Sequence, residues 1–387
     1  MLGTSSFCLA ACLLLVVVQG VQAADQDAAN ELPTSLLFVS QDDRDVAFRN
    51  IDQMLPTRAV LSGEYVYPMP NALEAVNLDY EVDGSTFSFA NFLKDRQLRG
   101  LLVWKDGHVV FEHYHPEHNA ETRWVSFSVS KSVTSMLIGA AIQDGFIKSV
   151  DEPVVNYVSR FKGTGYEGAS IKDVLQMASG LAWDETYSDP ESDVSKAGSA
   201  IGVELVNYLA GKERVAEPGE TFNYNTGETN LVGEILRSAI GNNAATYLTH
   251  KIWTPFGMGG DAHWLLGSQG GGETGGCCIS ATLRDYARIG IFALNNGQLA
   301  DGTQVLPESW MADSTSPSKG YEGYGYLWWI GADDKFSARG IYGQNIHINP
   351  NSRVIVVTHS NAEAAVQTQY HEHLDAVIAA LDKKFSE

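Results

Sequence analysis

The sequence predicts an α+β protein, in which an antiparallel sheet built from both ends of the chain is flanked by helices and carries an inserted, mostly helical lobe. Two β-hairpin patterns and the segment between them predict this class. Residues 101–113 form two apolar runs around an Asp-Gly turn, and residues 341–359 form two runs around Pro-Asn-Ser. Between them, residues 128–258 show apolar positions at helical spacing, interrupted by Gly and Pro turns.

The elements follow in chain order from local patterns. After the first hairpin, a helix is expected from residue 128, where Val129, Val133 and Met136 recur at helical spacing. Shorter helical patterns follow, and the last segment has helical composition and is expected to pack on the sheet. These segments are residues 171–177, 230–240 and 372–385. We assign an α/β lobe to about residues 36–127 and 277–387, and a helical lobe to about residues 128–276.

Length and charge limit the classes of function. The chain has 387 residues, of which 44% are hydrophobic, enough for one large core or two fused lobes. Its formal net charge is −21. An acidic surface repels phosphate backbones and anionic lipid headgroups, so we expect neither nucleic acid nor an anionic membrane as a partner.

The first 23 residues resemble an export signal. Residues 7–18 form an apolar run of the length of a signal core, and Val21-Gln-Ala23 resembles a cleavage site, although no Lys or Arg precedes the run. A lipoprotein box ending at Cys12 is the less favoured alternative, because the apolar run continues beyond this cysteine. We therefore predict a signal peptide at residues 1–23, a mature domain at residues 24–387 and a periplasmic or secreted location, without stable membrane insertion after the signal is removed.

Four cysteines are present, and two of them lie in the predicted signal. The mature chain would keep only the adjacent pair Cys277 and Cys278. Neighbouring cysteines rarely bond to each other because the ring is strained, and no spacing typical of metal ligands is present. We expect these two residues to be small, buried and unbonded.

Ser128-Val-Ser-Lys131 is the segment that carries the chemistry. A serine hydroxyl needs a base within hydrogen-bond reach to act as a nucleophile. A lysine three residues later lies on the same face of the first helical turn, and burial can lower its pKa towards neutrality. The start of the helix adds free backbone N–H groups beside the position of an oxyanion.

Two later segments extend this pattern. Tyr224 ends a short segment after a Pro-Gly turn, and beside a lysine ammonium its phenol would ionise more easily than usual. Ala338-Arg-Gly-Ile341 opens the second hairpin. Because side chains alternate along a strand, Ala338 is expected to face the site and Arg339 the opposite side, so that the site favours neutral substrates.

In this order the three segments resemble the motifs of the serine β-lactamase and penicillin-binding-protein superfamily, specifically its class C-like branch. Ser128 and Lys131 match its first motif, S-x-x-K. Tyr224 matches the second motif, Y-x-N, but Thr226 replaces the asparagine, and residues 338–340 stand where K-T-G is found. Within the branch, residues 183–190 and 340–344 most resemble 6-aminohexanoate-dimer (nylon-oligomer) hydrolases and related carboxylesterases.

This resemblance implies a β-lactamase/DD-peptidase-like fold and a serine hydrolase that cleaves small amides or esters through an acyl-enzyme on Ser128. Lys131 and Tyr224 would share the proton. The backbone N–H groups of Ser128 and Ile341 would form the oxyanion hole. No metal ion or organic cofactor is implied. The residues that the resemblance implies for substrate binding are Tyr187, Thr226, Tyr342 and Gly343.

Other functions remain open at this point. β-Lactamase or D-amino peptidase activity is an alternative, weakened by the loss of the K-T-G lysine and of the Y-x-N asparagine. A catalytically silent binding protein of the same fold is the alternative from another class, and intact Ser128, Lys131 and Tyr224 argue against it. His359 beside Ser360 could suggest a Ser-His-Asp triad, but no G-x-S-x-G segment accompanies it.

Overall fold

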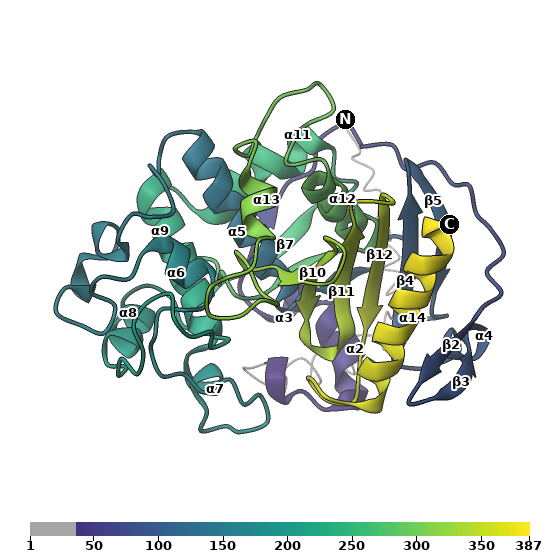
Figure 1. The fold of residues 1–387 in the computed structure, drawn as a ribbon, viewed down its shortest axis with the longest axis horizontal. Coiled ribbons are helices and arrows are strands. Elements are labelled where there is room, and N and C mark those ends of the chain that lie inside the picture. The colour runs from purple at the N-terminus through teal and green to yellow at the C-terminus, as the bar shows by residue number, and fades with distance from the viewer. Residues whose placement is uncertain (1–35) are drawn as a thin grey trace, which may run out of the picture.

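A six-stranded antiparallel sheet forms the centre of the protein in the computed structural model, which describes residues 36–387 (Figure 1). The predicted signal peptide, residues 1–23, lies outside the described residues. The strand order is β5-β4-β12-β11-β10-β9. The strands, in that order, are His108–Tyr114, Leu98–Lys105, Val354–Ser360, Gln344–Asn349, Phe336–Gly340 and Trp329–Ile330.

Both predicted hairpins are confirmed. β4 and β5 pair antiparallel around the Asp-Gly turn, and β11 and β12 pair around residues 350–353. The second hairpin differs at its start, because β10 ends at Gly340 and residues 341–343 form a tight turn before β11 begins at Gln344. Strand β12 joins the two hairpins by pairing with β4, so the N-terminal and C-terminal parts of the chain share one sheet.

Alternation along the central strand separates two hydrophobic layers. Val354 and Val356 of β12 face helices α2 (Gln41–Arg49) and α14 (Gln369–Ser386), whereas Ile355 and Val357 face helices α5 (Val129–Gln143) and α12 (Leu283–Leu294). All seven residues of β12 are buried, as expected for a strand covered on both faces. The C-terminal helix α14 crosses the sheet beside β12 and β4 in Figure 1.

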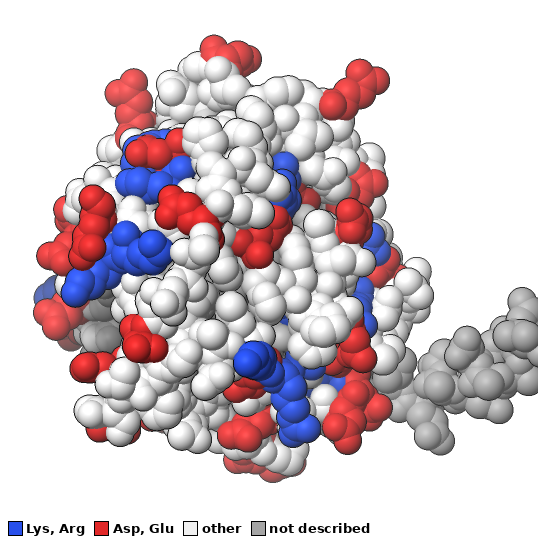
Figure 2. All heavy atoms as spheres, turned by 90° about the vertical axis from the view of Figure 1, so that its right-hand side faces the viewer, with Lys and Arg blue, Asp and Glu red and all other residues white. Residues whose placement is uncertain are grey.

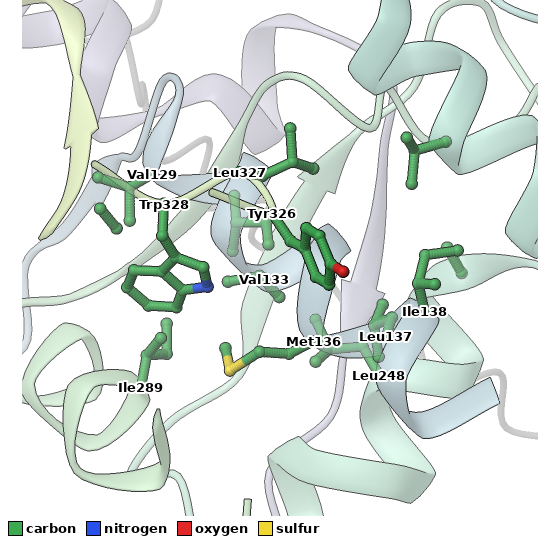
Figure 3. Close-up of a cluster of buried hydrophobic side chains, with 14 of the residues drawn as sticks. Val129, Val133, Met136, Leu137, Ile138, Leu248, Ile289, Tyr326, Leu327 and Trp328 are labelled. Atoms are coloured by element: carbon green, nitrogen blue, oxygen red, sulfur yellow. The ribbon is translucent and has the colours of Figure 1, made fainter. Parts of the chain in front are cut away.

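Helix α5 is buried almost throughout, because the protein surrounds it. Figure 3 shows Val129, Val133 and Met136 of this helix pointing towards Trp328, and Ile289 of α12 lies nearby. This packing fixes the direction of the helix whose first turn carries the serine and the lysine.

The remaining helices lie mainly between the two hairpins in sequence. Figure 1 places α6, α8 and α9 on the side of the molecule away from α14. The short segments around them include single turns of 3-10 helix at Leu36–Phe38, Val154–Asn156 and Ser159–Phe161 and a π-helical turn at Thr249–Trp253. The remaining α-helices are α3 (Ile51–Met54), α4 (Phe89–Phe92), α6 (Ile171–Leu175), α7 (Asp193–Ala197), α8 (Gly202–Ala210), α9 (Thr226–Ile240), α10 (Ala244–Leu248), α11 (Thr254–Phe256) and α13 (Trp310–Ser314).

Two smaller sheets complete the structure. A four-stranded antiparallel sheet has the order β1-β7-β8-β6, and its last strand leads into α5. A hairpin of β2 and β3 packs near α14. Their strands are Thr57–Val60, Ala262–Leu265, Ile279–Thr282, Arg123–Val125, Asp79–Val82 and Ser85–Ser88.

The charged surface agrees with the composition. Figure 2 shows Asp and Glu spread over the face seen from the right of Figure 1, with Lys and Arg often beside them. From residue 36 onward, no helix combines the length and the apolar character that a bilayer crossing requires.

Candidate active site

Ser128 lies at the point where strand β6 turns into helix α5. The turn requires an unusual backbone, since Phe127 has φ 43°, in the left-handed region. Ser128 is the residue that precedes the first turn of α5, and its side chain does not cap the helix. Its backbone N–H donates to none of the described residues, so this donor is available for an oxyanion.

Lys131 follows on the same helix and is almost completely buried, with 1% of its surface exposed. Its Nζ donates to the Thr226 hydroxyl at 2.9 Å and to the Gly276 carbonyl at 3.0 Å. Burial lowers the pKa of this ammonium to about 8, while the charge of Glu185 acts in the opposite direction. The lysine is therefore tuned to give up its proton near neutral pH, as a general base must.

Tyr224 contacts both of these residues. Its hydroxyl hydrogen-bonds with the Ser128 side chain, and its ring lies 5.4 Å from Lys131 Nζ. The Trp329 ring stacks on the Tyr224 ring, with the ring centres 5.6 Å apart. The expectation of an easily ionised phenol is wrong: burial and then the charge of Glu185 raise the pKa of Tyr224, so the group is a neutral proton donor.

The end of β10 approaches the nucleophile closely. A Cβ at Gly340 would lie 2.4 Å from the Ser126 carbonyl oxygen and 3.2 Å from the Phe127 Cβ, so only glycine lets the two segments meet without a shift. This contact brings the backbone at Ile341 to the entrance of the site. Ile341 lines the same two cavities as Ser128.

Ser128 stands where two cavities meet. The larger one has a volume of about 1010 Å³, and Tyr187, Tyr224 and Gly343 are among its lining residues. The smaller one has a volume of about 160 Å³ and a largely apolar wall. That wall includes Leu36, Leu55, Phe127, Val194, Leu265 and Leu266.

The predicted substrate-binding residues differ in their placement. Tyr187 and Gly343 line the larger cavity. The prediction for Tyr342 is wrong in one respect: although this residue borders the cavity, its ring packs between Phe48 and Phe127 and its hydroxyl donates to the Leu37 carbonyl at 3.0 Å. The cause is a φ of 62° at Tyr342, which ends the alternation of the strand.

Thr226 departs from expectation, whereas Arg339 lies on the predicted face of the strand. Thr226 borders the small cavity, but its hydroxyl is already occupied between Lys131 and Glu185, so it positions the base. Arg339 points to the face of the sheet opposite Ala338, as predicted, and it still lines the rim of the large cavity because that cavity extends around the end of β10 towards α14. There Arg339 pairs with Asp375 at 3.4 Å.

Glu185 was missed by sequence reasoning. Its carboxylate accepts the Thr226 hydroxyl, the Thr226 backbone N–H at 3.0 Å and the Tyr187 hydroxyl at 3.0 Å. Hydrogen bonds thus run from Lys131 through Thr226 to Glu185. The available signal was its position two residues before Tyr187 in Trp183-Asp-Glu-Thr-Tyr187, a segment already noted for its resemblance.

The expectation of two unbonded cysteines is also corrected. The structure joins Cys277 and Cys278 by a disulfide, since the turn after Thr274 places their side chains together. Cys278 is buried and Cys277 lines the small cavity. Among residues 36–387, no group of three or more His, Cys, Asp or Glu side chains is arranged to hold a metal ion.

Comparison with known proteins identifies the family of the chain. The Beta-lactamase family model matches residues 88–380. The 6-aminohexanoate-dimer hydrolase of Paenarthrobacter ureafaciens is 28% identical over 342 residues, covering 80% of this chain and 83% of that protein.

Solved structures show the same fold at lower identity. A candidate 6-aminohexanoate-dimer hydrolase from Bacillus anthracis has a TM-score of 0.78 at 21% identity, over 91% of this chain and 99% of that chain. A penicillin-binding protein from Bacillus halodurans has a TM-score of 0.59 at 18% identity, over 76% and 99%. The predicted fold class and superfamily are thereby confirmed, and the chain belongs to the Beta-lactamase family as a hydrolase of that fold.

Proposed function

We propose that the protein is a serine hydrolase that cleaves small amides or esters through an acyl-enzyme on Ser128. The observation that carries this proposal is the buried Lys131, whose pKa is lowered to about 8 beside the Ser128–Tyr224 hydrogen bond. A silent binding protein would gain nothing from a desolvated lysine, which costs free energy to bury. The similarity to a 6-aminohexanoate-dimer hydrolase supports an amide or ester as the substrate.

The reaction would proceed in two halves. Ser128 Oγ attacks the carbonyl carbon, and its proton passes to neutral Lys131, with Tyr224 relaying it to the leaving amine or alcohol. The backbone N–H groups of Ser128 and Ile341 stabilise the oxyanion, at about 3 kcal/mol of barrier each. Water then attacks the serine ester, its proton is taken by the same base, and the acid is released while Ser128 is regenerated.

The two cavities indicate which part of the substrate binds on each side of Ser128. Tyr224 lines only the larger cavity, and a proton donor must lie beside the atom that leaves. The leaving group therefore occupies the larger cavity and the acyl group the smaller one. A cavity of about 150 Å³ can hold a benzene ring, so the small cavity fits a short aliphatic or a benzoyl group.

β-Lactamase or D-amino peptidase activity remains the second candidate, because the same fold and the same acyl-enzyme chemistry serve both. Export is proposed from the signal-like residues 1–23. A small-molecule amide or ester is the expected partner of the site.

A fluorescent fluorophosphonate tests the nucleophile. It should label the wild type and leave Ser128→Ala unlabelled, and thermal stability should change by about 1 kcal/mol or less. Rates with p-nitrophenyl butyrate, the 6-aminohexanoate dimer and nitrocefin then separate the candidates. Appreciable hydrolysis by purified Ser128→Ala would remove the assignment, and a tenfold advantage of nitrocefin would favour β-lactamase.

A further inference from the structure

Arg44 is a buried cation in the wall of the large cavity. It lies on α2 with 8% of its surface exposed, and it lines the same cavity as Ser128. Its Nε donates to the Val39 carbonyl at 3.1 Å, and its Nη1 donates to the carbonyls of Ala362 and Glu363 at 2.7 and 3.1 Å. Its second terminal nitrogen, Nη2, donates to none of the described residues.

The guanidinium has no carboxylate partner between residues 36 and 387. Other buried arginines do have one: Arg99 pairs with Asp45 at 2.6 Å and Arg288 with Asp285 at 2.8 Å. Burial lowers the pKa of Arg44; the Tyr342 phenol acts in the opposite direction, and no carboxylate of the described residues does. A buried cation without a counter-ion is costly, and a ligand that supplies the counter-ion recovers part of the cost.

The carboxylates that share the cavity wall are engaged elsewhere or lie at its rim. Glu185 accepts hydrogen bonds from Thr226, and Asp375 pairs with Arg339. Glu363 is exposed and offers Arg44 its backbone carbonyl. Within residues 36–387, the charge of Arg44 is therefore left for an occupant of the cavity.

Tyr342 holds this cation at a fixed distance from the reacting centre. The Arg44 guanidinium carbon lies 4.3 Å from the centre of the Tyr342 ring, and the other neighbours of that ring include Phe127, which precedes the nucleophile. Tyr342 also directly follows Ile341, one of the proposed oxyanion donors. One aromatic ring thus separates the guanidinium from the place where the carbonyl group would bind.

We propose that Arg44 forms a subsite for a free carboxylate on the leaving group, so that the preferred substrates are amides or esters of amino or hydroxy acids. The inference rests on the proposed acyl-transfer function, which directs the leaving group into the large cavity. A planar guanidinium recognises a carboxylate with directed N–H donors. A carboxylate subsite at Arg44 would reverse the preference for neutral substrates that was expected from the missing K-T-G lysine.

Matched ligands test the subsite. N-Butyryl derivatives of straight-chain ω-amino acids are compared with the corresponding carboxamides, which keep the scissile bond and lose the charge. For the best chain length, the wild type should give a kcat/KM at least about tenfold higher for the free acid, mainly through KM. Equal kcat/KM for acid and carboxamide at every chain length would overturn the proposal.

Substitutions test whether Arg44 is the residue that recognises the substrate carboxylate. Arg44→Gln should reduce the acid-to-carboxamide ratio towards one, and Arg44→Lys should keep part of it, because charge remains without the planar donors. Arg353→Gln, at an exposed arginine paired with Asp106, should keep the wild-type ratio. A ratio that survives Arg44→Gln, or that is lost only in Arg339→Gln, would refute the assignment to Arg44.

A binding measurement separates this inference from the catalytic proposal. In Ser128→Ala, calorimetry should show the free acid binding at least about tenfold more tightly than its carboxamide, whether or not the wild type turns it over. If neutral esters are not hydrolysed, the proposed function fails while the binding difference still tests the subsite. Equal affinities with intact esterase activity would refute the subsite alone.

Discussion

The Tyr166 hydroxyl donates a hydrogen bond at 3.4 Å to Oε1 of Glu228, in the first turn of helix α9, and both side chains are fully buried. Ser179 donates to the same oxygen, and Glu228 Oε2 has no hydrogen-bond partner. Burial raises the pKa of this carboxyl to about 8, although the two hydrogen bonds lower it. The folded protein therefore holds a proton on Glu228 at neutral pH.

Glu228→Gln should accordingly flatten the dependence of stability on pH. An unfolded glutamate titrates near pH 4.3, so Glu228 contributes fully to stability below that pH, and the contribution is lost as pH rises through about 8. Between about pH 5 and about pH 9 the wild type should lose on the order of a few kcal/mol relative to the variant. Urea unfolding measures this difference. The exposed Glu308→Gln should follow the wild type, and parallel curves for Glu228→Gln would show that Glu228 is ionised when folded.

Gly340→Ala should lower kcat strongly, whereas a Gly→Ala substitution at an uncrowded position should not. The added methyl group would meet the Ser126 carbonyl at 2.4 Å and push the end of β10 away from Ser128. Loss of one oxyanion donor lowers kcat by about 100-fold to 1,000-fold. Gly331→Ala is the matched control, since its nearest neighbour lies at 3.4 Å. A Gly340→Ala enzyme with wild-type kcat would show that this approach does not shape the oxyanion hole.

Lys131 should set the pH profile. Only the neutral amine accepts a proton, so kcat/KM should rise with pH and level off above about 8, the lowered pKa. Lys131→Arg should be nearly as damaging as Lys131→Ala, because a guanidinium does not release its proton. Rates with a neutral p-nitrophenyl ester from pH 5.5 upward measure both effects. Retention of most activity by Lys131→Arg would exclude general-base catalysis by this residue.

Glu185→Gln should shift the rising limb of that pH profile to lower pH. The carboxylate raises the pKa of Lys131, so its loss lets the lysine become neutral at lower pH. The plateau rate should also fall, because the bonds that hold Thr226 against Lys131 are weakened. Glu191 lies on the same loop, and its carboxylate pairs with the exposed Lys196. Glu191→Gln should therefore keep the wild-type pH profile. An unshifted limb in Glu185→Gln would mean that Glu185 acts only on local structure.

Local patterns were sufficient to predict the hairpins, helix α5 and the three motif segments. They failed where the chain leaves regular structure. Alternation correctly placed Arg339 on the face opposite Ala338. The resemblance placed Tyr342 in the substrate site, but β10 ends at Gly340 and the left-handed turn redirects the side chains that follow. The positions of these residues depend on the turn, whose conformation depends on contacts with Phe48 and Phe127.

Long-range contacts explain the residues that were missed. Glu185 reaches Lys131 only through Thr226, which is 41 positions further along the chain. Arg44 reaches the cavity because α2 packs near residues 362 and 363, more than 300 positions away. Arg44 belongs to no segment singled out in the sequence, and the segment that contains Glu185 was noted only for its resemblance, so the folded arrangement is needed to show what each residue contacts.

Strand β12, fully buried between β4 and β11, has a consequence for how the protein is made. Residues 354–360 are synthesised after β4, β5 and the whole helical region, yet they occupy the middle of the sheet and join β4 to the later hairpin. The six-stranded sheet cannot form before β12 has been synthesised. Until then β4 can pair with β5, but its other edge has no partner strand. Pairing between such distant segments slows folding and favours aggregation. A chain shortened before Val354 would therefore lack the sheet that orients its catalytic serine.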